Sequence, residues 1–247
     1  MSGTSPPSTS GPRGSRPTAL DDVDSTPTLH ERLRERLRAL PAIVGSPPPF
    51  DPQLAPESPR ELVLEWLDAA ISAGVPEAHA ATLSTVDASG RPDARVLALK
   101  DITPDGSFEI ASGGESAKAA QLRSNPACAL SFFWTPLARA IRIRGTAIPA
   151  TADEAAADFL ARPLDARAIT LLGRQSDPIG IDEDPRALIA DSLDRVQDRP
   201  EMISRDWTVW RIRPETIEFW QGSPDRSHLR LRYHRDGDRW NHERLWA

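Results

Sequence analysis

The hydrophobic pattern of this chain changes its period near residue 79. Before that point, leucines recur at helical spacing over residues 29–40 in a charged background, and apolar residues repeat with the same period over 60–73. Both patterns predict amphipathic helices. Between them lies a proline-rich stretch at 47–52. We therefore expect residues 28–58 to form a short helix followed by a connector.

From residue 79 onward, short β-rich runs alternate with turn residues. The runs 80–86 and 94–100 flank Asp-Ala-Ser-Gly-Arg-Pro, a sequence that favours a β-hairpin. Many antiparallel strands joined by short connections are typical of a barrel and not of a parallel sheet. The pattern therefore predicts a mostly β fold with peripheral helices. The expected strands are 80–86, 94–100, 107–111, 127–134, 138–148, 207–213, 215–220, 227–234 and 240–245, and the expected helices of this part are 151–161, 166–172 and 185–196.

Residues 1–27 differ in composition from the rest of the chain. They are mainly Ser, Thr, Pro and Gly with few large apolar groups, so they bury too little surface to offset the entropy of ordering. We expect a disordered tail at 1–27 and a single domain over 59–247.

Composition and charge narrow the class of protein. The chain of 247 residues has a net charge of −6, and its acidic and basic residues are interspersed. The sequence therefore has no cluster of basic residues of the kind that binds nucleic acid. The lone Cys128 excludes an intramolecular disulfide and a thiolate metal cluster, and no metal site is expected. No apolar stretch approaches the roughly 20 residues that span a bilayer, and the first residues lack the hydrophobic core of a signal peptide. We expect a cytoplasmic protein without a membrane partner.

The most distinctive chemistry lies near the C-terminus, where the Trp-Gln-Gly sequence at 220–222 precedes three basic residues at alternate positions. On a strand, Arg226, His228 and Arg230 would share one face. The same alternation is typical of a half-solvated antiparallel strand with its arginines outside. Alternation alone therefore does not define a site.

Three further motifs precede this segment in a fixed order: Ser-Gly-Arg-Pro-Asp-Ala-Arg-Val-Leu-Ala-Leu-Lys at 89–100, Ser-Ala-Lys-Ala at 116–119 and Gln-Ser at 175–176. Together with 220–222 and 226–230, they resemble the pyridoxamine/pyridoxine 5'-phosphate oxidase family, the enzymes that make pyridoxal 5'-phosphate. The resemblance implies an FMN-binding split β-barrel that assembles as a homodimer, with FMN in the two clefts between subunits.

The resemblance implies a flavin site that is built from several segments. The loop 112–116 runs into a helix expected to begin near Ala117, where free N–H groups and the positive helix end favour a phosphate. An ordinary strand-to-helix turn has the same sequence character. By resemblance, Gln175 and Ser176 contact the flavin across the dimer interface. The residues implied to bind FMN are Arg95, Val96, Leu97, Ala98, Leu99, Lys100, Ala111, Ser112, Ser116, Lys118, Gln175, Ser176, Trp220 and Arg230.

Arg95 and Lys100 are separated by an odd number of positions, so an ideal strand would place them on opposite faces. A shared ligand therefore requires Lys100 to lie past the end of the strand or beyond a bulge. The alternative is an arginine in solvent at one end of the strand and a snorkelling lysine at the other.

The resemblance also implies a substrate site in which Arg226 and His228 are the catalytic residues, holding the substrate near the carbon that loses hydride. Asp158 and Ala166 depart from the family, which grips the substrate phosphate with a tyrosine and a serine at these positions. A carboxylate repels a phosphate unless Arg162 neutralises it, and alanine donates no hydrogen bond. The residues implied to bind substrate are Lys100, Asp158, Arg162, Arg226 and His228.

The flavin site also departs from the family pattern. Ala117 stands where the family commonly has a second basic residue, Ala140 where it has a glutamine beside the flavin, and Ala111 where an aromatic is usual. Losing a cation and an amide is expected to weaken FMN binding by about 1–3 kcal/mol unless another residue compensates. The candidates to compensate are Arg123, Arg139 and Arg142.

The implied activity is that of an FMN-dependent oxidase. Hydride passes from a small anionic or aromatic substrate to the flavin, which oxygen reoxidises. Two alternatives remain open: a flavin oxidase of a cyclic, phenazine-type secondary-metabolite intermediate, and a non-catalytic module that binds flavin or pyridoxal phosphate. Turnover of a panel of substrates distinguishes them.

Overall fold

The computed structural model describes residues 1–3 and 27–246, so nearly all of the tail expected at 1–27 lies outside the described residues. The chain divides into two units, Met1–Pro41 and Ala42–Ala247. In the first unit, the leucine-spaced segment forms helix α1 (Leu29–Ala39), as its period predicted. Thr28 and Glu31 cap the start of this helix reciprocally, which satisfies two backbone N–H groups that the helix leaves free.

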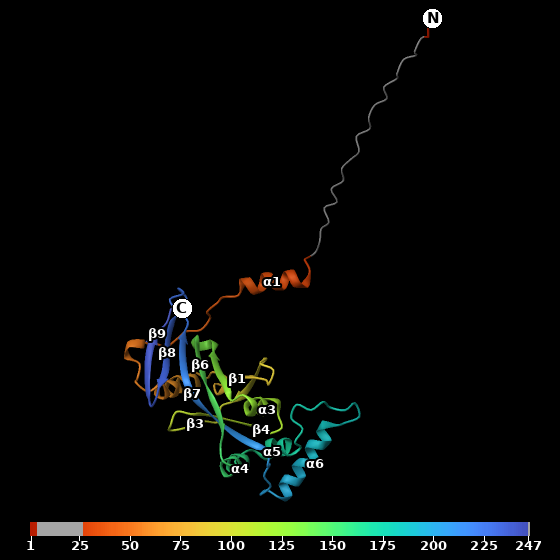
Figure 1. Cartoon of the computed structure of the whole chain (residues 1–247), viewed down its shortest axis with the longest axis vertical. Helices are drawn as coiled ribbons and strands as arrows, with labels where there is room; N and C mark the ends of the chain where they lie inside the picture. The colour runs from red at the N-terminus through yellow and green to blue at the C-terminus, as the bar shows by residue number, and fades with distance from the viewer. Residues whose placement is uncertain (4–26, 247) are drawn as a thin grey trace. The chain divides into compact units, whose positions relative to one another are not determined.

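In the described part of the second unit, nine strands form one antiparallel sheet. Its main path runs β2-β1-β5-β6-β7-β4-β3, while β8 pairs with β7 and β9. The first half of β7 pairs with β4 and its second half with β8, so the sheet divides along this strand and curves into a half-barrel (Figure 1). The bounds are β1 (Ala80–Val86), β2 (Pro92–Ala98), β3 (Asp101–Ile102), β4 (Phe108–Gly113), β5 (Ala127–Trp134), β6 (Arg139–Pro149), β7 (Trp207–Gln221), β8 (Leu229–Asp236) and β9 (Arg239–Arg244).

The prediction of two strands at 207–213 and 215–220 was wrong, because β7 runs through Pro214 without a break. A register shift between Arg144 and Gly145 of β6 lies opposite this proline. Proline donates no N–H to a ladder, and a β-bulge is where a sheet tolerates it. A Cβ at Gly145 would clash with the carbonyl oxygen of Arg213, so the close approach at the bulge requires glycine.

The predicted hairpin is confirmed: β1 and β2 pair along their whole length, with Gly90 in the left-handed region at φ +83° in the turn. However, β2 ends at Ala98, two residues earlier than expected. Lys100 therefore lies past the end of the strand, which is one of the two arrangements that a ligand shared with Arg95 requires.

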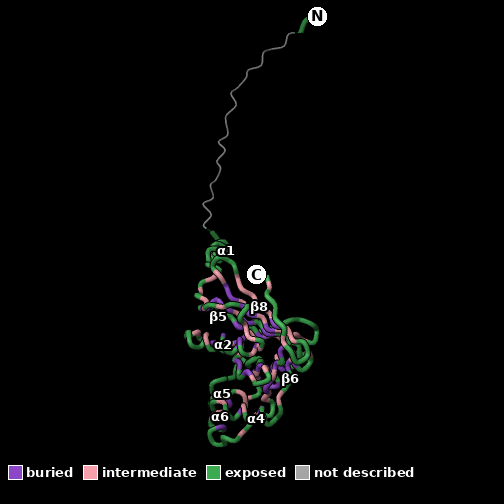
Figure 2. Tube along the Cα trace, turned by 90° about the vertical axis from the view of Figure 1, so that its left-hand side faces the viewer, coloured by how far each residue is buried: buried purple, intermediate pink, exposed green. Residues whose placement is uncertain are grey.

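Helix α2 (Pro59–Ser72) closes the core of the half-barrel. Trp66 is fully buried, with its ring edge-on to those of Phe50 and Phe219 at 5.1 Å each, and the guanidinium carbon of Arg139 lies 4.1 Å from its centroid. Figure 2 shows the buried positions concentrated along the strands, whereas α6 (Pro185–Asp198) is mostly exposed. Burying side chains of this size contributes about 1.5–3 kcal/mol each, so this aromatic cluster is a main source of stability.

The other helices lie around the sheet. Helix α3 (Ala117–Ser124) packs against β1 and β4, α4 (Ala152–Leu160) against β7, and α5 (Leu164–Leu171) against α6. Figure 1 shows α4, α5 and α6 gathered at one end of the sheet, beside the start of β7. Short 3₁₀ turns lie at Pro52–Leu54 and Thr135–Leu137. Among the helices that the structure describes, none is both long and apolar enough to cross a membrane.

Candidate functional site

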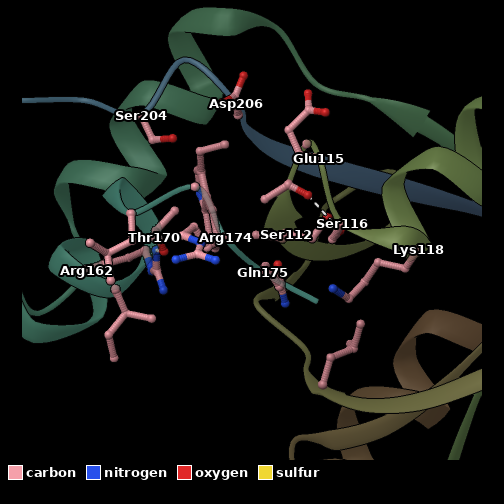
Figure 3. Close-up of a pocket in the computed structure, with 18 of the residues that line it drawn as sticks. Ser112, Glu115, Ser116, Lys118, Arg162, Thr170, Arg174, Gln175, Ser204 and Asp206 are labelled. Carbon is pink, nitrogen blue, oxygen red and sulfur yellow. Dashed lines mark hydrogen bonds between the residues drawn. The ribbon is translucent and has the colours of Figure 1, made fainter. Parts of the chain in front are cut away.

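A cavity of about 390 Å³ lies between the end of β4, the start of α3, helix α5 and the loop after α5. Figure 3 shows Arg162, Thr170 and Arg174 on one side of this cavity and Ser112, Ser116 and Lys118 on the other. Seven of the residues implied to bind flavin line it: Val96, Leu97, Ala111, Ser112, Ser116, Lys118 and Gln175. Segments far apart in the sequence thus converge on one space, as the resemblance implied.

The start of α3 is built to accept an anion. The helix begins at Ala117, as expected, and Ser116 precedes it with no side-chain capping bond, because its hydroxyl donates instead to the carbonyl of Gly113 at 2.7 Å. The N–H groups of the first turn therefore keep no side-chain acceptor. Free N–H groups and the positive end of the helix dipole together favour a phosphate at this point.

Lys118 provides a cation in the first turn of α3. Its pKa is lowered, first because the side chain is half-buried and second because the Arg95 guanidinium lies nearby. Within residues 27–246, no carboxylate lies at ion-pair distance from Lys118, and Figure 3 shows its amino group turned toward Gln175. A buried ammonium without a counter-ion is costly, so these donors fit the phosphate of FMN.

Arg95 is held in place by its own sheet and by α3. Its guanidinium donates to the Thr85 hydroxyl at 2.6 Å and to Gln121 Oε1 at 2.9 Å, and pairs with the Asp93 carboxylate. Arg95 lines a second pocket of about 360 Å³ that adjoins the first at Val96, Lys118 and Gln175. The guanidinium is thus oriented before any ligand binds.

Gln175 and Ser176 line the same second pocket. The resemblance places these two residues against flavin across the dimer interface, but here they lie beside Lys118 of their own chain. The loop after α5 turns back because Ser176 adopts φ +77°, a left-handed conformation that costs a non-glycine residue about 1–3 kcal/mol. Strain of this kind is concentrated at functional sites.

The rest of the 95–100 segment divides between cavity and core. Val96 is largely exposed and Ala98 is exposed, whereas Leu99 is 8% exposed and belongs to the hydrophobic core. Leu99 follows the end of β2, where its backbone N–H donates to the carbonyl oxygen of His79 at 2.9 Å and its side chain packs in the core. The Leu99 side chain therefore does not face the flavin, although the resemblance implied that the whole segment lines it.

Lys100, Asp158 and Arg162 do lie together, and Trp207 joins them. The Lys100 ammonium is 3.0 Å from one carboxylate oxygen of Asp158, while the indole N–H of Trp207 donates to the other at 2.7 Å. The guanidinium of Arg162 stacks on the Trp207 ring, with its central carbon 4.0 Å from the centroid, and donates to the Thr170 hydroxyl at 2.6 Å. Burial lowers the pKa of Arg162, and Asp158 opposes this shift. Asp158 thus has both of its oxygens engaged by the protein.

The site residues implied from the sequence leave out several side chains of this cavity: Glu115, Ile169, Thr170, Leu172, Arg174, Ser204, Asp206 and Trp207. Arg174 adjoins the Gln-Ser motif, and that position is a signal that could have identified it. Trp207 was expected only as the first residue of a strand. Nothing local distinguishes an indole that binds a carboxylate from one that packs in a core.

Trp220 and Arg230 line a different pocket of about 300 Å³, together with Ala140, Arg142 and Glu218. Arg230 donates to Glu218 Oε1 at 2.7 and 3.1 Å and to the carbonyl oxygen of Trp246 at 2.9 Å. We call this pocket the β6–β8 pocket. It forms no part of the cavity at α3.

Arg226 and His228 do not lie on a strand, so the shared face expected for Arg226, His228 and Arg230 was wrong. Strand β8 begins only at Leu229, and Arg226 lies in the preceding turn at φ +67°. The Asp225 carboxylate accepts hydrogen bonds from the Ser223 and Ser227 hydroxyls, which lowers its pKa to about 2. These local bonds favour a turn over a strand.

His228 lies beside Trp220, with the ring centroids 5.2 Å apart. Its Nδ1 accepts the backbone N–H of Ser223 at 2.9 Å, so in the neutral imidazole the proton is on Nε2. His228 is thus held as a hydrogen-bond donor next to the β6–β8 pocket.

The antiparallel half-barrel, with a basic cavity at a helix N-terminus, defines a protein of the split-barrel class. Residues 67–221 match the family described as Pyridoxamine 5'-phosphate oxidase, and residues 207–247 match the Pyridoxine 5'-phosphate oxidase C-terminal dimerisation region. The chain therefore belongs to the pyridoxamine 5'-phosphate oxidase family.

Curated relatives agree with this assignment. The chain is 40% identical over 192 residues to the pyridoxine/pyridoxamine 5'-phosphate oxidase of Bordetella pertussis, covering 77% of this chain and 90% of that protein. It is 38% identical over 193 residues to the enzyme of the same name from a strain of Pseudomonas fluorescens, covering 77% and 89%.

Two solved structures are similar in fold. One is PhzG from Burkholderia lata in complex with tetrahydrophenazine-1-carboxylic acid, with a TM-score of 0.77, 29% identity, and coverage of 82% of this chain and 100% of that one. The other is a pyridoxamine 5'-phosphate oxidase-related, FMN-binding protein from Nostoc punctiforme, with a TM-score of 0.63, 19% identity, and coverage of 78% and 99%. The second likeness shows the fold alone.

Proposed function

We propose that this protein is a homodimeric, FMN-dependent oxidase of a small anionic or aromatic substrate, with oxygen as the final electron acceptor. The observation that carries the proposal is the start of α3, where N–H groups without a side-chain cap and the half-buried Lys118, which has no ion-pair partner in the described part of the chain, line one cavity. This donor set fits the phosphate of FMN. Bound FMN would accept hydride from the substrate and pass the electrons to oxygen.

In this proposal, residues of the cavity at α3, of the adjoining pocket at Arg95 and of the β6–β8 pocket hold the cofactor. Ser116 positions the start of α3, Lys118 and Arg95 supply positive charge, and Gln175 and Ser176 close the cavity from the loop after α5. Trp220 and Arg230 contribute from the β6–β8 pocket. Val96, Leu97 and Ala111 provide an apolar wall for the ring system.

The substrate is held by two further groups of residues. Arg162, stacked on Trp207, offers guanidinium N–H groups to an anionic end of the substrate, and Lys100 adds a charge that Asp158 partly neutralises. Arg226 and His228 orient the reacting part of the substrate, with His228 holding a proton at Nε2.

The dimer follows from the match of residues 207–247 to the family's dimerisation region. That region contains Trp220, His228 and Arg230, whereas Lys118 and Arg162 line a separate cavity of the same chain. In the proposed dimer, the C-terminal region of one subunit lies against the cavity at α3 of its partner. Because every contact of an isologous interface occurs twice, this arrangement brings the two groups together in each of two clefts.

A second candidate substrate is a cyclic intermediate with a carboxylate. It is favoured by the ion pair between Lys100 and Asp158, which, within residues 27–246, leaves Arg162 as the cation without an ion-paired carboxylate at this end of the cavity. One guanidinium balances the single charge of a carboxylate but only half the charge of a phosphate dianion. The similar PhzG structure holds tetrahydrophenazine-1-carboxylic acid, a molecule of that kind.

Titration with FMN tests the proposal. We expect quenching of flavin fluorescence at one FMN per subunit and oxygen consumption with at least one donor from a panel of pyridoxamine 5'-phosphate, pyridoxine 5'-phosphate and cyclic carboxylates. Saturable binding of a deazaflavin or haem with no binding of FMN would overturn the cofactor assignment. Tight FMN binding without turnover of any donor would favour a non-catalytic flavin-binding module.

A further inference from the structure

The face of the sheet around Ala140 carries two adjacent rows of side chains. In one row, Ala140 of β6 lies opposite Trp220 of β7, which lies opposite Arg230 of β8. Residues two apart on a strand share a face, so the next row is on the same side of the sheet. There, Arg142 of β6 lies opposite Glu218 of β7.

Both rows open into the β6–β8 pocket, which Ala140 and Arg142 line together with Trp220 and Arg230. Ala140 ends at its Cβ and carries no polar atom, so it gives this part of the pocket no hydrogen-bond donor. Arg142 is the adjacent residue of β6 on this face, and its longer side chain reaches the same space.

The Arg142 guanidinium is positioned by a shared carboxylate. Glu218 accepts from Arg142 at 2.6 Å through Oε2 and from Arg230 at 2.7 Å through Oε1, and its side chain is 11% exposed. Two guanidinium groups on one carboxylate leave a net positive charge at the pocket. Arg142 uses one N–H for this pair, and its half-exposed side chain keeps other donors for a ligand.

The other two arginines named as candidates to compensate, Arg139 and Arg123, are placed differently. Arg139 is 2% exposed, donates to Gln221 at 2.8 Å and stacks on Trp66, so it belongs to the core. Arg123 lies in the last turn of α3, away from its anion-accepting start. Only Arg142 combines an open pocket, a fixed orientation and unused donors.

We infer that Arg142 is a flavin-binding residue that replaces the hydrogen-bond donor missing at Ala140. The inference rests on the proposed binding of FMN. A guanidinium donates to ring carbonyl oxygens as an amide does, and it also brings a positive charge. Because reduction places negative charge on the flavin ring, Arg142 favours reduced over oxidised FMN and raises the midpoint potential.

Equilibrium titration of the full-length dimer with FMN tests this inference. Arg142→Ala should weaken FMN binding about tenfold, the loss expected for one hydrogen bond from a charged donor. Arg144→Ala is the matched control, since Arg144 is exposed on the same strand two residues further along and should leave the affinity unchanged. The melting temperature of both variants without FMN shows that the fold is intact.

A second substitution and a second measurement sharpen the test. Ala140→Gln should restore FMN affinity in the Arg142→Ala background and change it less in the wild type. The midpoint potential of bound FMN should fall in Arg142→Ala, by about 30 mV if the preference for reduced flavin drops tenfold.

The two proposals fail in different ways. If wild-type protein does not bind FMN, the proposed function is wrong. If wild-type protein binds FMN while Arg142→Ala and Arg144→Ala bind it equally well and at an unchanged potential, the inference on Arg142 is wrong and the proposed function stands.

Discussion

The ammonium group of Lys100 lies 3.0 Å from the carboxylate of Asp158, whose second oxygen accepts the indole N–H of Trp207. The Asp158 carboxylate thus forms an ion pair with Lys100, the cation that the resemblance assigns to the substrate phosphate. The pair is only partly buried, so solvent moderates its strength, but it removes a net charge from this end of the cavity. We therefore expect the substrate preference of the proposed oxidase to depend on Asp158.

Replacing Asp158 with Asn should make the cavity more receptive to phosphate. Asparagine keeps an oxygen that accepts from Trp207, but it no longer neutralises Lys100. We expect kcat/KM for pyridoxamine 5'-phosphate to rise about tenfold, mostly through KM, as expected for one released charge-assisted contact. Asp153→Asn, an exposed change on the same helix, is the control. An unchanged or lower kcat/KM in Asp158→Asn would show that other residues hold the phosphate.

Lys118→Ala should weaken FMN binding about tenfold or more, because Ala117 leaves no second cation in this dipeptide. The dependence on pH gives an independent readout. Burial lowers the pKa of Lys118, and a bound phosphate raises it again, so FMN affinity should be full below the lowered pKa and fall as pH rises through it.

Fluorescence titration of FMN between neutral and alkaline pH measures this effect. Lys118→Arg should keep the affinity and flatten its alkaline decline, because an arginine does not lose its charge in this range. An equal decline in wild type and in Lys118→Ala would assign the pH dependence to another group.

Asp225→Ala should loosen the turn that carries Arg226 and His228. The pKa of Asp225 is lowered to about 2 by the hydrogen bonds from the Ser223 and Ser227 hydroxyls. The stabilisation of the turn by these bonds is therefore complete at a pH above about 4, the pKa of an aspartate in the unfolded chain, and is lost as the pH falls toward 2. We expect faster hydrogen exchange at 223–227 and a lower kcat/KM, with little change in the melting temperature. Unchanged exchange in the variant would show that the turn does not depend on this carboxylate.

Mixed dimers test whether each cleft is built from two subunits. Lys118→Ala and His228→Ala each damage both sites of a homodimer, but in a mixed dimer one site receives both wild-type residues. At an FMN concentration that saturates the wild type but leaves Lys118→Ala mostly empty, random exchange of the two variants should therefore restore about a quarter of wild-type turnover. No recovery after exchange, verified by mass spectrometry of mixed dimers, would place Lys118 and His228 in the same cleft from one chain.

Most of the local elements could be predicted from the sequence. The hairpin around Gly90 and the start of α3 at Ala117 were both predicted, because each depends on bonds within a few residues. The motifs also identified the family and eight of the residues that line the cavity at α3.

The pairing of chemically active side chains, by contrast, depends on how the elements pack. Asp158 binds Lys100 and Trp207 because α4 lies against β7, and no local pattern encodes that approach. The same holds for Pro214, which stays inside β7 because the bulge of β6 accommodates it. Arg226 lies outside the expected strand for a different, local reason: the Asp225 carboxylate accepts hydrogen bonds from Ser223 and Ser227, and the alternation of basic residues did not reveal these bonds. Spacing along the chain predicts which residues share an element, whereas packing between elements decides which charges meet.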